Sequence, residues 1–113
     1  MDNLDEFGKI FINEVRDKSI EEMQKRIDGS MKGESAKLVQ EKVDKFNYEQ
    51  KEFLKYILSL TVNNTLHNFL WMIEQYDELK LLYNDTDIRE ESDGLTGELY
   101  TEDGWIEKYT KYK

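Results

Sequence analysis

The sequence contains one histidine, and its side chain is the first that could do chemistry near neutral pH. On a helix over residues 48–76, four chemically useful side chains would share one face at spacings of three and four residues: Asn64, His67, Trp71 and Glu74. An amide, an imidazole and a carboxylate on one face would suit a small ligand-binding or enzymatic pocket. The alternative is that His67 and Trp71 lie at the edge of the core, with their polar atoms hydrogen-bonded or solvated.

The other motifs that could support catalysis or metal binding are incomplete. A zinc site needs about three protein ligands, whereas the chain has one histidine and no cysteine. Residues 85–94 fail the EF-hand pattern, because a start at Asp85 places Glu90 at the glycine position and a start at Asp87 places Arg89 at the third ligand position. Gly94 and Gly97 lack the lysine and hydroxyl that follow a phosphate-binding loop. We therefore expect a protein without enzymatic activity, cofactor or metal.

Residues 85–103 instead suggest an interaction surface, because they contain eight acids against Arg89 alone. Large aromatic side chains lie within and beside these acids, and Tyr and Trp dominate the binding energy of many interfaces. Such a surface would suit a basic protein partner. The predicted contact residues are Asp93, Glu98, Tyr100, Glu102, Asp103 and Trp105. Alternatively, Leu99, Tyr100, Trp105 and Ile106 fold back over the central helix, which leaves only the acids exposed.

Helices are the elements that must position these residues. The chain of 113 residues has no proline, and hydrophobic residues recur at helical spacing. One stripe is Leu4, Phe7, Phe11 and Val15, and a second is Ile20, Met23 and Ile27. The phase slips at residues 16–19, where Ser19 and Glu22 fit a capping box, so this point is a new helix or a kink.

The longest expected helix covers residues 48–76 and begins at a second capping box, Asn47 and Gln50. Its apolar residues occupy much of its circumference, so we expect neighbours to contact it on several sides. A shorter helix should precede it at residues 34–46. The predicted fold is therefore all-α, a single domain of four or five helices around a long central helix.

The C-terminal third should be irregular and acidic. Residues 78–83 either extend the long helix or form a short strand, and residues 95–100 are a short strand or an extended loop. Thr101 could cap a final short helix with an aromatic face.

Composition limits the partners. The net charge of −9 argues against nucleic-acid binding, and it is localised: residues 1–56 carry −2 and residues 57–113 carry −7. The most apolar window, residues 57–73, is interrupted by His67 and three asparagines, so we expect no membrane span. The absence of cysteine fits the cytoplasm. The stripes at residues 4–15 and 38–46 could also support a homodimer.

In composition, this small, acidic, cysteine-free chain resembles bacterial immunity proteins that neutralise basic nuclease toxins; the likeness involves no motif and no particular residue. The sequence thus favours a non-enzymatic protein-interaction module that binds a basic partner through its acidic C-terminal segment. The alternative is the small pocket on the His67 face.

Overall fold

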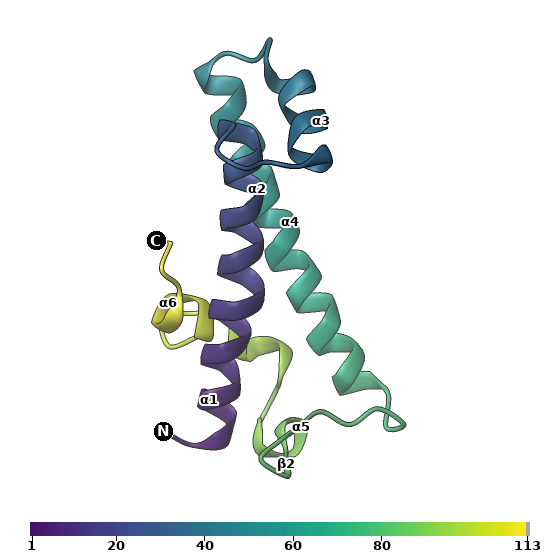
Figure 1. Ribbon diagram of the computed structural model, residues 1–113. Helices are drawn as coiled ribbons and strands as arrows, with labels where there is room; N and C mark the ends of the chain where they lie inside the picture. The colour runs from purple at the N-terminus through teal and green to yellow at the C-terminus, as the bar shows by residue number, and fades with distance from the viewer. Residues whose placement is uncertain (113) are drawn as a thin grey trace.

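The computed structural model describes residues 1–112, which form an elongated helical hairpin measuring 48 × 29 × 22 Å. One arm is a continuous helix made of α1 (Asn3–Ile10), the π-helical segment η1 (Phe11–Asp17) and α2 (Lys18–Asp28). The other arm, α4 (Tyr48–Gln75), runs back alongside it (Figure 1). A short helix, α3 (Glu34–Val43), lies between them in the chain and covers one end of the hairpin. The predicted all-α fold around a long helix is confirmed.

The phase slip seen in the sequence at residues 16–19 falls at the end of the π-helical segment η1 (Phe11–Asp17) and does not mark the start of a separate helix. A π turn contains more residues than an α turn, so the buried face can shift without interrupting the helix. Ser19 therefore lies within the helix, and the N-cap position of α2, Asp17, makes no side-chain capping bond. The shift also exposes Val15, whereas Ile12, one residue from the predicted stripe, is fully buried.

The start of α4 is as predicted. The Asn47 side chain accepts a hydrogen bond from the backbone N–H of Gln50 at 2.8 Å, and the Gln50 side chain accepts one from the backbone N–H of Asn47 at 2.9 Å. This reciprocal pair satisfies two N–H groups that the first turn would otherwise leave unpaired. The helix continues for 28 residues and ends one residue before the predicted boundary.

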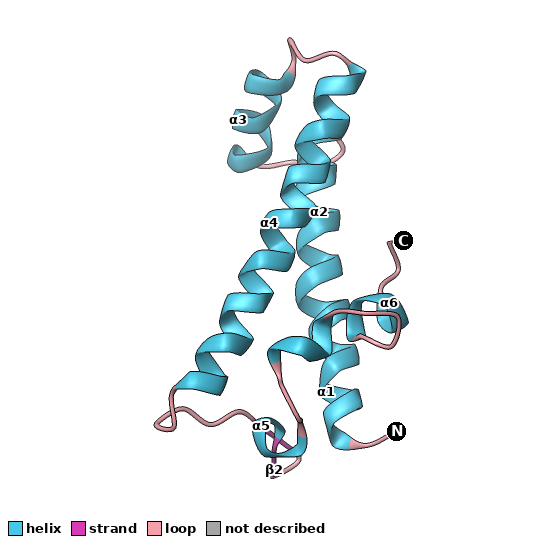
Figure 2. Cartoon of the chain, turned by 180° about the vertical axis from the view of Figure 1, so that it is seen from behind, coloured by secondary structure: helices cyan, strands magenta, loops and turns pink. Residues whose placement is uncertain are grey.

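Beyond α4 the chain forms short elements that pack across the open end of the hairpin (Figure 2). Strands β1 (Leu82–Tyr83) and β2 (Thr86–Asp87) pair antiparallel, and are followed by α5 (Ile88–Glu91), the 3₁₀ helix η2 (Thr96–Leu99) and α6 (Trp105–Tyr109). Residues 95–100 are thus mainly a 3₁₀ turn and not a strand or an extended loop. The N-cap of α6 is Gly104, so Thr101 does not cap it.

The main core lies at this open end, which we call the base. It joins η1, the last turns of α4 and the C-terminal elements; its buried members are Phe11, Ile12, Leu66, Leu70, Ile73, Ile88, Leu95, Leu99 and Trp105. At the opposite end, which we call the tip (residues 25–55), few side chains are buried. Those buried on or near α3 are Ile27, Ala36 and Val43.

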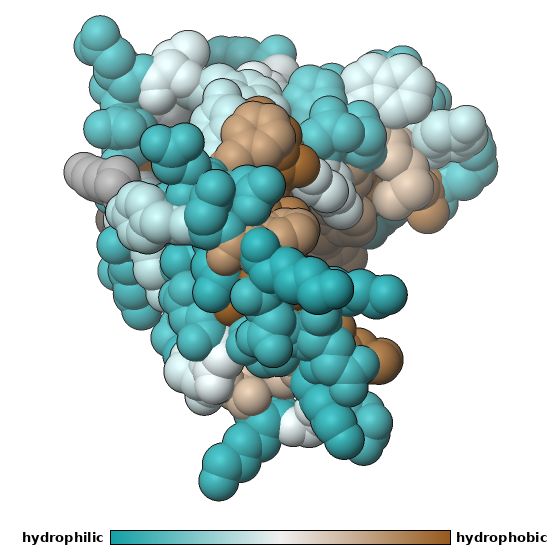
Figure 3. Space-filling view, turned by 90° about the horizontal axis from the view of Figure 1, so that it is seen from above, coloured by the Kyte–Doolittle hydropathy of each residue, from teal (hydrophilic) through white to brown (hydrophobic). Residues whose placement is uncertain are grey.

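The expectation that neighbours contact α4 on several sides is not met within one chain. Its inner side packs on the first arm and on η2, while large apolar side chains on its outer side, including Phe53, Leu60 and Trp71, are exposed. Viewed onto the tip, apolar residues reach the surface between hydrophilic ones (Figure 3). The chain therefore leaves one face of its longest helix without a partner among residues 1–112.

Candidate functional site

The structure does not bring the His67 face together as one pocket. His67 is half-buried and its ring lies against that of Tyr100, with centroids 5.9 Å apart. Asn64 is exposed, and His67 lines none of the five best-formed hollows among residues 1–112. The imidazole therefore serves as a packing partner for a C-terminal tyrosine.

The other two members of this face have separate surroundings. The Glu74 carboxylate accepts a hydrogen bond from the backbone N–H of Thr96, the first residue of η2. This bond fixes the 3₁₀ turn to α4 and gives Glu74 a structural role. Trp71 is 50% exposed and lines a different groove on the outer side of α4.

Five of the six predicted partner-binding residues lie at or near the surface of the base. Asp93, Glu102 and Asp103 are exposed, and Tyr100 keeps 41% of its surface accessible. Glu98 is half-buried and accepts a hydrogen bond from the Ser92 hydroxyl at 3.0 Å. Its carboxylate is therefore partly engaged within the chain.

Trp105, the sixth predicted residue, does not lie on this surface, and the interpretation of it as a partner contact does not hold. Its side chain is 1% exposed and packs edge-on against Phe7 and Phe11, with centroids 5.8 and 6.5 Å away. The ring also fills the space beside Gly8, where a Cβ atom would lie 2.4 Å from it. Burying a ring of this size in the core contributes a large favourable free energy to folding. For Trp105, the alternative prediction that the C-terminal aromatic residues fold back onto the chain is therefore correct.

The acids of the base greatly outnumber the cations available to pair with them. Residues 77–107, which we call the acidic segment, contain eleven acids and two bases, a net charge of −9. Both bases are engaged: Arg89 lies 3.2 Å from Asp77, and Lys80 lies 3.6 Å from Asp87. Among residues 1–112 the following acids of the segment form no ion pair within 4.0 Å: Glu78, Asp85, Glu91, Asp93, Glu98, Glu102, Asp103 and Glu107.

The turn that presents Glu102 and Asp103 is tightly constrained. Thr101 adopts a φ of 76°, a left-handed conformation that is rare for a β-branched residue. Gly104 packs so closely on the backbone of Leu99 and Tyr100 that a Cβ atom there would lie 2.0 Å from a carbonyl oxygen. Strained backbone of this kind persists only where the surroundings hold it. The two acids are therefore displayed from a fixed turn.

Sequence reasoning missed a buried polar network beneath the C-terminus. Arg16 and Asp17, in η1, are adjacent in sequence and both buried, and their side chains bond at 2.8 Å. Arg16 also donates to Asn63 of α4 and to the Thr110 hydroxyl, each at 2.8 Å. Asp17 accepts a bond from the backbone N–H of Lys111 at 2.7 Å. The network ties three segments together, and the phase slip at residues 16–19 was its only signal in the sequence.

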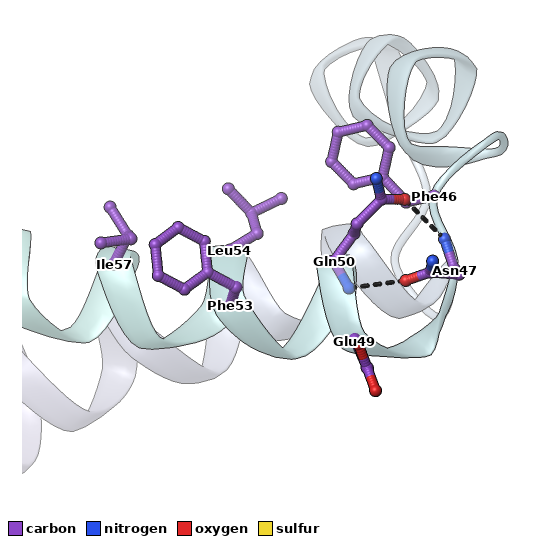
Figure 4. A pocket seen from close by; sticks show the side chains of 7 residues that line it. All are labelled: Phe46, Asn47, Glu49, Gln50, Phe53, Leu54 and Ile57. Atoms are coloured by element: carbon purple, nitrogen blue, oxygen red, sulfur yellow. Dashed lines mark hydrogen bonds between the residues drawn. The ribbon is translucent and has the colours of Figure 1, made fainter.

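Sequence reasoning also missed two apolar grooves on the outer side of α4. The tip groove has a volume of about 670 Å³ and is lined by Phe46, Asn47, Glu49, Gln50, Phe53, Leu54 and Ile57. In Figure 4, Phe53, Leu54 and Ile57 project from the same side of α4, and Glu49 points away from them. The base groove, of about 480 Å³, is lined by Asn68, Trp71, Met72, Tyr76 and Leu79.

A third apolar hollow, of about 540 Å³, lies between α2, α3 and α4 at the tip. Its lining includes Met23, Leu38 and Leu58, and Lys42 is its one charged member. It shares Phe46 and Leu54 with the tip groove, so the packing at the tip is open on both sides of these residues.

Within residues 1–112, no three side chains of His, Asp or Glu gather as ligands for a metal ion. None of the helices described combines the length and the apolar character that crossing a bilayer requires.

Comparison with known proteins gives no relative: no protein-family model, no curated protein and no solved structure matches the chain.

Proposed function

We propose that the chain is a non-enzymatic protein-interaction module that binds a basic protein partner through its acidic segment. The observation that carries the proposal is the excess of exposed acids on a constrained surface, with both cations of the segment already engaged. A field of one sign attracts a partner of the opposite sign and accelerates their encounter. A rigid display also lowers the entropy that binding would cost.

Tyr100 gives this surface an apolar contact beside the acids. Its ring is braced from behind by His67, and 41% of the side chain is accessible. Tyrosine contributes large contact area at low conformational cost, which makes it a suitable anchor. The module would thus combine one aromatic contact with charges that confer specificity.

The proposal that the module is non-enzymatic is supported by how its candidate catalytic groups are used. His67 packs against Tyr100, and Glu74 accepts a backbone hydrogen bond. General acid–base chemistry requires such groups to face a substrate within hydrogen-bonding reach. Here both are engaged in holding the C-terminal elements on α4.

A pull-down with a matched control tests the proposal. The test variant is Glu102→Lys/Asp103→Lys at the base, and the control is Glu41→Lys/Asp44→Lys at the C-terminal end of α3, where both acids are exposed. The two variants change the net charge equally, so only the position differs. Each is immobilised and incubated with an extract of the source cells, and the bound proteins are identified by mass spectrometry.

We expect wild type and control to retain the same basic protein. The base variant should retain at least about tenfold less of it, and raising the salt to about 1 M should release it from wild type, because exposed charges are screened. Equal recovery on the base variant, or recovery insensitive to salt, would contradict the proposal.

A further inference from the structure

The two grooves on α4 repeat one pattern on one face of the helix. Gln50, Phe53 and Leu54 of the tip groove lie 18 residues before Asn68, Trp71 and Met72 of the base groove. Eighteen residues are five full turns at 3.6 residues per turn, so the two sets point in the same direction, about 27 Å apart. The outer face of α4 therefore carries the same pattern twice, once on each side of residues 60–65.

The stretch between the grooves carries no charge. Residues 56–73 are eighteen consecutive residues without Asp, Glu, Lys or Arg. On the outer face, Thr61 and Thr65 lie midway, and each hydroxyl donates to a carbonyl of the helix itself at 2.8 Å. Their hydrogen-bonding needs are thus partly met without solvent. An uncharged face of this kind does not attract a charged partner. Two copies of it can meet without repulsion between like charges.

The exposed apolar area is about what a dimer needs. Stable interfaces bury about 800 Å² on each partner. At roughly 200 Å² for a whole aromatic side chain, the exposed fractions of the aromatic residues of both grooves amount to about 400 Å². These fractions are 39% for Phe46, 63% for Phe53, 50% for Trp71 and 51% for Tyr76. The exposed parts of Ile57, Leu60 and Leu79, with the amides of Asn64 and Asn68, supply much of the remainder.

The charges at the two ends favour one orientation. The tip, residues 25–55, has eight bases and six acids and a net charge of +2, whereas the acidic segment carries −9. A parallel pair would bring two acidic segments together, and like charges in proximity cost free energy. An antiparallel pair places the tip of each copy near the base of the other, which joins opposite charges.

We propose that two copies of the chain associate antiparallel through the outer face of α4, with the two-fold axis near residues 60–65. Trp71 of each copy then lies over the tip groove of the other, close to Phe53 and Leu54. The elements that carry most of the acidic segment pack on α1 and on the inner side of α4, so they remain accessible. The apolar contacts of the dimer lie on the outer face of α4, whereas Glu102 and Asp103, which the pull-down variant replaces, lie on another segment, so separate variants test the two proposals.

Sedimentation tests the association. We expect wild type to sediment as a dimer at roughly 100 μM, because interfaces of this size have Kd values of micromolar or tighter. Phe53→Glu and Trp71→Glu should each weaken the dimer at least about tenfold, because each buries an unpaired charge in both symmetric contacts. Tyr48→Glu is the matched control: Tyr48 is 77% exposed, and at 3.6 residues per turn it lies about 140° around α4 from Phe53, so this variant should dimerise as wild type. Far-UV circular dichroism should show that all three variants fold.

Disulfide cross-linking tests the orientation. Because the native chain has no cysteine, only the introduced thiols can form disulfides. In the double variant Gln50→Cys/Gln75→Cys, the two positions lie about 38 Å apart along one helix, so they cannot pair within a chain. The antiparallel dimer should give disulfides between residue 50 of one copy and residue 75 of the other after mild oxidation. Pairs of 50 with 50 and 75 with 75 would overturn the antiparallel arrangement. A wild-type protein that sediments as a monomer at roughly 100 μM would overturn the dimer altogether.

Discussion

The base and the tip of the molecule use the same helix, α4, in different ways. At the base, α4 packs on η1 and η2, and its residues Leu66, Leu70 and Ile73 are buried in the core shared with these segments. At the tip, α4 packs on α2 and shares an open hollow with α3 among residues 1–112, and its Phe53 side chain is 63% exposed. Apolar sequence alone does not bury a helix, because burial also requires a covering element on each side.

This difference implies an uneven distribution of stability. Segments with many buried apolar contacts open only with global unfolding, whereas sparsely packed segments open at lower free energy. We therefore expect the base to set the stability of the isolated chain. The tip should gain most from an additional partner.

Replacing the central ring of the base should have the largest effect. Trp105→Ala should lower the free energy of unfolding by about 3–5 kcal/mol, because it leaves a large cavity in the core. Phe53→Ala at the tip should cost no more than about 0.5 kcal/mol in dilute protein, where association does not contribute. Urea unfolding followed by circular dichroism measures both.

Trp105→Phe is the matched control for the base. The indole N–H has no hydrogen-bond partner among residues 1–112, so the conservative change loses ring volume but no polar contact. Most of the stability should be retained. Equal losses for Trp105→Ala and Phe53→Ala would contradict the contrast between the two regions.

Breaking the buried ion pair should have the next largest effect. Asp17→Ala leaves the Arg16 guanidinium buried without its counterion, and should lower the free energy of unfolding by about 3 kcal/mol. It also removes the acceptor for the backbone N–H of Lys111, so trypsin should cleave the C-terminal residues faster. The double variant Arg16→Met/Asp17→Leu should be more stable than Asp17→Ala, because no buried charge remains. A double variant that is less stable would show that the network contributes more than charge neutralisation.

The smallest effect concerns an ion pair of the tip. Lys55 lies 2.8 Å from Asp28, and the hydrogen bond to this carboxylate raises the pKa of Lys55 above its ordinary value of 10.5, although burial opposes the shift. A raised pKa of a lysine stabilises the fold at pH values below 10.5, and this contribution is lost as the pH rises through the folded-state pKa. Lys55→Gln should therefore cost less than about 1 kcal/mol at pH 7. The difference from wild type should shrink at alkaline pH, and a difference that grows there would contradict this origin.

The sequence predicted those features that depend on local pattern. The capping box of Asn47 and Gln50 and the length of α4 follow from helical signals within a few residues, and the structure confirms them. The slip at residues 16–19 was also visible, but a change of phase has the same signature whether a helix breaks or widens into a π turn. The buried Arg16–Asp17 pair could not be foreseen, because its partners Asn63 and Thr110 are far away in sequence.

The candidate sites were harder to predict than the fold. The acids of residues 85–103 were located from charge alone, whereas Trp105 is buried because Gly8, almost a hundred residues earlier, leaves room for its ring. The outer face of α4 was read as a surface to be covered, since apolar residues surround the helix. An apolar pattern predicts that this face of α4 is buried, but it does not indicate whether the same chain or a second one buries it.

Amide hydrogen exchange along α4, measured in dilute and in concentrated protein, tests most directly whether the tip is completed by a second copy. We expect that in dilute protein the amides of residues 51–58 exchange much faster than those of residues 66–73, and that raising the concentration protects the tip amides more than the base amides. Equal protection of the two regions in dilute protein, or tip protection that does not depend on concentration, would contradict this expectation.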